Sequence, residues 1–232
     1  MKPYIFLLVL SIPSLTVAAP PFHTAEGLFD LSNSKTLGLT TISGEHVEIH
    51  HATEESGFRF AHHPGLIAFK GRIYCSWSNG RVHEDRPNQR VLYASSADGS
   101  TWSAARVLTA PPESVYGSCV AAGFHVHDEN LVAYFTLTHE YPTPNLQNEK
   151  NAAWAIVSQD GMDWGEPTKI ASGFYIEAPR TLSNGRLFLG GEHTGEIWKS
   201  HQARMRLLYT DSANGIDGWK QAAIDPSVVK PN

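Results

Sequence analysis

The feature that most constrains this fold is a short motif that occurs twice along the chain. The motif has the form Ser-x-Asp-Gly-x-x-Trp and covers Ser96–Trp102 and Ser158–Trp164. A weaker third copy covers Thr210–Gly215 and is followed by Trp219. The copies lie about 60 residues apart, and self-similarity at a regular spacing is typical of chains built from repeated structural units.

A run of β-forming residues precedes each copy of the motif. None of these regions shows a sustained apolar period of 3.6 residues, so strands are favoured over helices. We therefore expect little helix in the chain. The three runs are Val91–Ser95, Ala153–Val157 and Met205–Tyr209.

A hairpin is predicted upstream of each run, because glycine and asparagine supply the positive φ values that a tight turn requires. Each repeat therefore holds four antiparallel strands. One such sheet cannot bury both of its faces alone, so successive sheets must stack. We predict an all-β fold, a β-propeller whose blades are four-stranded antiparallel sheets. The turns are predicted at Lys70-Gly71, Glu129-Asn130 and Asn184-Gly185.

The composition is that of an ordinary globular protein, with 41% hydrophobic and 18% charged residues. The net charge of −5 lacks the basic excess that attracts nucleic acid, so we expect no nucleic-acid partner. Cys75 and Cys119 match neither a zinc-site nor a redox spacing, and one disulfide or two free thiols remain open alternatives. His125 and His127 lack a clear third ligand, so we expect no metal site and no cofactor.

The N-terminus has the order of a secretory signal peptide. Lys2 precedes an apolar stretch beginning at Tyr4, and small residues follow at Ala18 and Ala19. Pro13 interrupts a stretch that is already shorter than the roughly 20 apolar residues of a spanning helix. We predict a signal peptide over residues 1–19 and a propeller domain over 20–232. The mature protein is expected to be secreted or periplasmic, with no membrane segment.

The repeated motif resembles the Asp-box, or BNR repeat, of the sialidase (neuraminidase) superfamily, and the resemblance runs from about Phe58 to Trp219. It implies a six-bladed propeller with one box in each blade. The box is structural in that family, where it closes the turn between the third and fourth strands on the face away from the active site. The box residues here are Ser96, Asp98, Gly99, Trp102, Ser158, Asp160, Gly161 and Trp164.

The resemblance also implies candidate catalytic residues. By position, Arg59 matches an arginine of the family's first blade, and Asp85 or Glu84 matches an acid/base aspartate. Glu177 matches a glutamate that activates a tyrosine nucleophile in the family. The family usually places a second, substrate-binding arginine where this chain has Gly190–His193. A bidentate carboxylate clamp cannot be built from those residues, which argues against cleavage of sialic acid.

The repeats support a site independently of the resemblance. Counting back from the predicted turns aligns His63 with Ala122 and Glu177, at the entry to the innermost strand of each blade. Innermost strands converge on the central pocket of a propeller, so acids, bases and cations there favour a carbohydrate site. The residues expected to join His63 and Glu177 are Tyr175 and Asp85 or Glu84 as catalytic groups, and Arg59, His62, Arg81 and Arg180 as substrate-binding groups.

Three functions fit this set of residues. The first is an exo-glycosidase of sialidase-like type, in which Asp85 or Glu84 protonates the leaving oxygen and Glu177, or a tyrosine that it activates, attacks or orients water. The second is a lyase or a rhamnosidase-like propeller acting on uronate-containing glycans, where His63 would serve as base in the lyase. The third is a glycan-binding propeller without catalysis. Two alternatives without function also stay open. In the first, His62 and His63 form only hydrogen bonds that close the blade, and in the second, Glu84–Arg86 is a solvated loop.

The chain length limits how many blades can form. At about 60 residues for each repeat, the region from about Gly57 to Ile224 supplies only three blades. Propellers typically close with four to eight blades. We therefore expect an incomplete propeller from a partial chain, which needs further blades or a partner chain to close.

Overall fold

The computed structural model describes residues 25–40, 42–144, 147–196 and 205–223. The chain divides into two compact units, Met1–His46 and Val47–Asn232. The described part of the first unit consists of turns and irregular segments, and the backbone N–H of Asp30 donates to the carbonyl oxygen of Leu37 at 2.8 Å. The predicted signal peptide, residues 1–19, lies outside the described residues. Over the described ranges, the structure has no helix that is long and apolar enough to cross a membrane.

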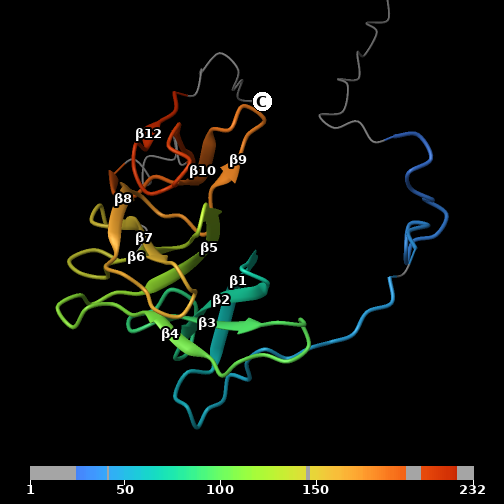
Figure 1. The fold of residues 1–232 in the computed structure, drawn as a ribbon, viewed down its shortest axis with the longest axis horizontal. Coiled ribbons are helices and arrows are strands. Elements are labelled where there is room, and N and C mark those ends of the chain that lie inside the picture. The colour runs from blue at the N-terminus through green and yellow to red at the C-terminus, as the bar shows by residue number, and fades with distance from the viewer. Residues whose placement is uncertain (1–24, 41, 145–146, 197–204, 224–232) are drawn as a thin grey trace, which may run out of the picture. The chain divides into compact units, whose positions relative to one another are not determined.

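Three four-stranded antiparallel sheets make up the second unit, as predicted (Figure 1). In each sheet the strands follow one another in chain order, which is the meander expected of a propeller blade. The first blade contains β1 (Phe60–Phe69), β2 (Arg72–Gly80), β3 (Arg90–Ser96) and β4 (Arg106–Thr109). The second contains β5 (Cys119–His127), β6 (Asn130–Leu137), β7 (Ala152–Ser158) and β8 (Thr168–Ser172). The third contains β9 (Arg180–Thr181), β10 (Leu187–Glu192), β11 (Met205–Thr210) and β12 (Lys220–Gln221).

The hairpin turns lie close to their predicted positions. Phe69 pairs with Arg72, so Lys70-Gly71 forms the first turn as predicted. His127 pairs with Asn130, so the second turn is Asp128-Glu129 and not Glu129-Asn130. Asp128 adopts the positive φ of 51° that this turn requires.

The core lies between successive blades. One cluster of apolar side chains joins the first blade, through residues such as Tyr74 and Tyr93, to Phe124 and Phe135 of the second. Smaller clusters join the second blade to the third, for example Ala153 with Leu208. The innermost strands approach closely, since a Cβ atom added at Gly65 would lie 2.9 Å from the Cα atom of Gly123.

The first repeated motif closes the turn between the third and fourth strands of its blade. Asp98 Oδ1 accepts hydrogen bonds from the backbone N–H groups of Ser100 (2.8 Å) and Thr101 (2.7 Å). Ser96 Oγ accepts the N–H of Gly99 at 2.8 Å, and Gly99 takes a φ of 76°. Because these donors stabilise the carboxylate, the pKa of Asp98 falls to about 2.

The other two copies form similar turns. Asp160 Oδ1 accepts the N–H groups of Met162 (2.8 Å) and Asp163 (2.9 Å). In the weaker third copy, Asn214 Oδ1 takes this place and accepts the N–H of Ile216 at 2.8 Å. An amide oxygen therefore replaces the carboxylate without loss of the turn.

Each of the later motifs also contacts the preceding blade. Tyr74 donates its hydroxyl proton to the carbonyl oxygen of Asp160 at 3.2 Å. Tyr134 donates in the same way to the carbonyl oxygen of Gly215 at 3.0 Å. These motifs therefore help to hold neighbouring blades together, which is a structural role.

Both cysteines are free thiols, which settles the choice that the sequence left open. Burial raises the pKa of Cys75 to about 11 and that of Cys119 to about 12. The two side chains belong to different apolar clusters, Cys119 to the one between the first two blades and Cys75 to a cluster with Trp77 and Leu92.

Candidate functional site

A cavity of about 430 Å³ opens where the chain enters the innermost strands of all three blades. His63–Leu66 line it from β1, Ala122–Phe124 from β5, and Ile176–Arg180 from the segment that leads into β9. His63, Ala122 and Glu177, which the repeats align, therefore line one cavity. The repeated motifs follow β3, β7 and β11, at the opposite ends of the strands.

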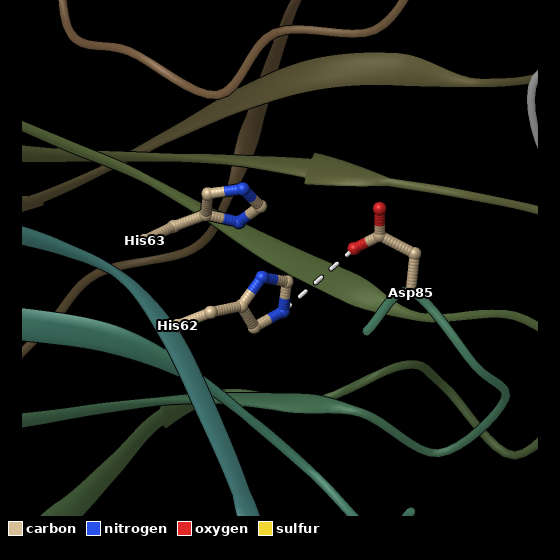
Figure 2. Close-up of side chains that lie close together, drawn as sticks. All are labelled: His62, His63 and Asp85. Atoms are coloured by element: carbon tan, nitrogen blue, oxygen red, sulfur yellow. Dashed lines mark ion pairs between the residues drawn. The ribbon is translucent and has the colours of Figure 1, made fainter. Parts of the chain in front are cut away.

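Two histidines and an aspartate form a cluster beside this cavity (Figure 2). One nitrogen of His62, one nitrogen of His63 and one carboxylate oxygen of Asp85 all lie within 4.8 Å of one another. The two imidazole rings lie 4.0 Å apart between their centroids. His62 Nε2 is 3.9 Å from Asp85 Oδ1. This is a compact group of acid and base side chains.

Irregular backbone brings these side chains together. The register between β1 and β2 shifts between His62 and Gly65, and the extra residues there allow adjacent histidines to reach the same cluster. Asp85 comes from the loop between β2 and β3, whose ends lie next to the start of β1 because Phe60 pairs with Gly80. His63 and Asp85 both take a φ of 53°, which is uncommon for residues with a side chain.

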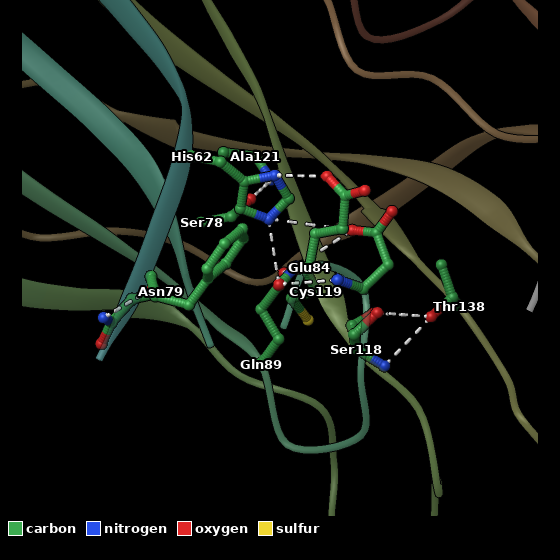
Figure 3. A network of polar contacts seen from close by, with 11 residues as sticks. His62, Ser78, Asn79, Glu84, Gln89, Ser118, Cys119, Ala121 and Thr138 are labelled. Carbon is green, nitrogen blue, oxygen red and sulfur yellow. Dashed lines mark hydrogen bonds and ion pairs between the residues drawn. The ribbon is translucent and has the colours of Figure 1, made fainter. Parts of the chain in front are cut away.

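Gln89 makes hydrogen bonds to two members of this cluster, His62 and Asp85, and to Cys119 at the start of β5 (Figure 3). Its side chain is fully buried, and its Nε2 donates to Asp85 Oδ1 (3.3 Å) and to the carbonyl oxygen of Cys119 (3.1 Å). Its Oε1 accepts the N–H of Asp85 at 2.9 Å and lies 3.0 Å from His62 Nε2. Sequence reasoning missed Gln89, because a glutamine ahead of a strand carries no signal that distinguishes it from a solvated residue.

Burial acts on the two types of group in opposite directions. It raises the pKa of Asp85, and hydrogen bonding to Gln89 opposes that effect only in part. It lowers the pKa of His63, and the neighbouring His62 lowers it further. The arrangement therefore favours a protonated Asp85 and a neutral His63 more than water would.

The remaining acidic candidates are more exposed. Glu84 Oε2 lies 3.6 Å from His62 Nδ1, but two thirds of its side chain is open to solvent. Glu177 Oε2 lies 3.3 Å from Arg180 Nη2, and both side chains are exposed at the cavity. Glu177 and Arg180 thus provide an accessible ion pair facing the cavity.

Three other predicted residues make their contacts outside the cluster. Arg59 pairs with Glu54 at 2.7 Å and does not line the cavity. Arg81 stacks over the ring of Phe58 at 4.8 Å. Tyr175 is buried in the core between the second and third blades, and its hydroxyl donates to the carbonyl oxygen of Ser172 at 3.1 Å. Burial also raises the pKa of Tyr175 to about 12, which disfavours the phenolate. We therefore leave Tyr175 out of the site.

Comparisons with known proteins address the fold. Neither a protein-family model nor a curated protein sequence matches the chain. The chain is similar to the crystal structure of a protein of unknown function from Dyadobacter fermentans, with 16% identity, a TM-score of 0.56, and coverage of 71% of this chain and 55% of that one. It is also similar to Trypanosoma rangeli sialidase, with 15% identity, a TM-score of 0.54, and coverage of 70% and 30%.

A third similar structure is a family 117 glycoside hydrolase from the marine bacterium Zobellia galactanivorans. The identity is 13%, the TM-score is 0.52, and the match covers 78% of this chain and 61% of that one. The chain thus has the fold of propeller glycosidases, and at these identities the likeness concerns the fold alone. The chain spans about half the length of the Dyadobacter protein and under a third of the sialidase.

Proposed function

We propose that this protein is a secreted glycoside hydrolase that removes terminal sugars from glycans, with Asp85 as the general acid. The observation that carries the proposal is the environment of Asp85, a largely buried carboxyl group beside His62 with a raised pKa. A general acid must hold its proton near the working pH, and burial is a common means of achieving this.

The cavity supplies the second half of the proposed machinery. Glycosidases generally use two carboxyl groups in different environments, one protonated and one ionised. Glu177 is exposed at the cavity and paired with Arg180, so it is accessible to act on water or on the sugar. His63 and Ala122 line the same cavity, and the imidazole of His63 adds a polar group to it.

The substrate is proposed to be a glycan other than a sialoside. The family's second arginine is replaced by Gly190–His193, and Glu192 there cannot clamp a carboxylate. Exo-action is suggested by the resemblance to sialidases, and secretion is suggested by the signal peptide predicted over residues 1–19. Both belong to this proposal.

The proposal is tested by incubating the protein with sialylated, uronate-rich and neutral glycans and measuring released sugar. The wild-type protein is expected to release a terminal sugar from at least one glycan. Asp85→Asn should lower turnover by about 10² to 10⁴-fold while the far-UV spectrum is unchanged. Asp163→Asn is the matched control, because Asp163 is an exposed carboxylate in a motif turn, and it should retain full activity. Normal activity in Asp85→Asn would remove Asp85 from the mechanism.

A lyase is the second candidate, and the observation that favours it is His63. Its lowered pKa keeps the imidazole neutral and able to accept a proton, and it lines the same cavity as Arg180. In that reaction His63 would remove the proton next to a uronate carboxylate that Arg180 neutralises. The same incubation distinguishes the candidates, since a lyase yields an absorbing unsaturated uronate. Retention of a glycan without any product would indicate a binding protein.

A further inference from the structure

Gln89 is a buried polar side chain that the proposed mechanism does not use. Its exposed fraction is 0%, although it sits in the loop-to-strand junction ahead of β3. Its backbone carbonyl also accepts the N–H of Cys119 at 2.9 Å, so the residue joins the first blade to the second at the level of the cluster. A buried amide with this many partners is costly to place unless all of them are satisfied.

The neighbours of Gln89 determine which way its amide points. The carbonyl oxygen of Cys119 can only accept a hydrogen bond, so the group that faces it at 3.1 Å must be the amide nitrogen. The backbone N–H of Asp85 can only donate, so the group that faces it at 2.9 Å must be the amide oxygen. The orientation of the amide therefore follows from the network and not from the atom labels.

This orientation determines the tautomer of His62. Gln89 Oε1 has no proton to give, so His62 Nε2, at 3.0 Å, must carry the proton that joins them. His62 Nδ1 then bears the lone pair in the neutral ring, and it faces Glu84 Oε2 at 3.6 Å. One amide thus orients His62 through its oxygen and Asp85 through its oxygen and its nitrogen.

We propose that Gln89 is a positioning residue, which holds Asp85 and the Nε2-protonated tautomer of His62 in a fixed arrangement beside the cavity. Gln89 does not line the cavity. It acts on Asp85 and His62 through hydrogen bonds, two to Asp85 and one to His62. The part of the proposal that concerns activity rests on the proposed function, and the part that concerns His62 does not.

The test uses this chain and NMR, so it requires no substrate. With ¹⁵N-labelled histidine, His62 is expected to show a protonated Nε2 and an unprotonated Nδ1 at neutral to alkaline pH; the signals are assigned by their absence in His62→Ala. In Gln89→Leu the fixed tautomer should be lost. Since Gln89 also donates to the Asp85 carboxylate, a ¹³C titration should show that the pKa of Asp85 rises in this variant.

Asn148→Ala is the matched control. Asn148 is another buried amide, which donates to the carbonyl oxygens of Tyr141 and Thr143 in a different loop. Its loss should lower the melting temperature, as the loss of Gln89 should, but leave the His62 tautomer and the Asp85 titration unchanged. Gln89→Glu is the second test variant, because its carboxylate can still accept from His62 Nε2 and should preserve the tautomer.

Two results would overturn the proposal. One is a wild-type His62 protonated on Nδ1 in the neutral ring, and the other is a His62 tautomer and an Asp85 titration that stay unchanged in folded Gln89→Leu. If a substrate has been found, the alkaline limb of its pH–rate profile should move to higher pH in Gln89→Leu. Failure of the glycosidase assay alone leaves the tautomer result standing, so the two proposals fail separately.

Discussion

At the scale of single residues, burial and hydrogen bonding decide what each ionisable group can do. Asp98 and Asp85 are both aspartates in loops next to β3, yet their environments differ. Asp98 is exposed and accepts several hydrogen bonds, which lower its pKa to about 2. Asp85 is largely buried, and burial raises its pKa. The first is therefore suited to closing a turn, whereas the second is suited to holding a proton.

The lowered pKa of Asp98 predicts a pH dependence of stability. A carboxyl group whose pKa is depressed on folding contributes stability above its unfolded value of about 3.9, and this contribution is lost as the pH falls through the folded value. Asp98→Ala should therefore lower the melting temperature at neutral pH, and the difference from wild type should shrink from about pH 5 towards pH 2. Thermal unfolding followed by circular dichroism measures this. If the difference in melting temperature stays constant from about pH 5 to pH 2, the charge of Asp98 does not stabilise its turn.

The limits of sequence reasoning are also clearest at this scale. The motif containing Asp98 was recognisable because its turn needs particular residues at fixed spacing. Gln89 was not recognisable, because its role depends on Cys119 and His62, which are distant in sequence. Tyr175 was expected at the site, but its ring packs between blades, and sequence adjacency to Glu177 does not reveal which side of the backbone faces the cavity.

At the scale of elements, the sequence predicted the positions of strands and turns more accurately than it predicted the register between paired strands. The predicted run Val91–Ser95 lies within β3, and the turn at Lys70-Gly71 is where the glycine indicated. The second turn was displaced by one residue, because Asp128 adopts the left-handed conformation in place of an expected Asn130. The register shift between His62 and Gly65 brings the two histidines into the cluster. Pro64 is the sole residue in the sequence that hints at this shift.

The close contact between innermost strands predicts the effect of a small substitution. A methyl group at Gly65 would lie 2.9 Å from the Cα atom of Gly123, and backbone atoms cannot move aside easily. Gly65→Ala should therefore lower the free energy of unfolding by about 1–3 kcal/mol. Gly190→Ala is the control, because its added methyl group meets only Leu207 at 4.0 Å. Urea denaturation measures both, and equal effects in the two variants would mean that the blades do not meet as closely as described.

At the scale of the whole molecule, all three blades line one cavity, and the first and third bring a base, an acid and a cation to it. Each blade contributes the entry of its innermost strand, which is why residues as distant in sequence as His63 and Glu177 line the same space. The repeats predicted this convergence, because they align His63, Ala122 and Glu177 at the same position in each blade, the entry to the innermost strand. The similar solved structures have the same fold at 13–16% identity, and the match covers no more than 61% of the three chains compared.

The most direct test of the central claim, that Asp85 is the general acid of a glycan-cleaving site, uses leaving groups of different acidity. The sugar identified in the glycan incubation is supplied both as the natural glycan and as a dinitrophenyl glycoside, whose leaving group needs no proton. For Asp85→Ala we predict a loss of about 10² to 10⁴-fold in kcat/KM on the natural glycan and a far smaller loss on the dinitrophenyl glycoside. Equal losses on the two substrates, or no loss on either, would contradict this role for Asp85.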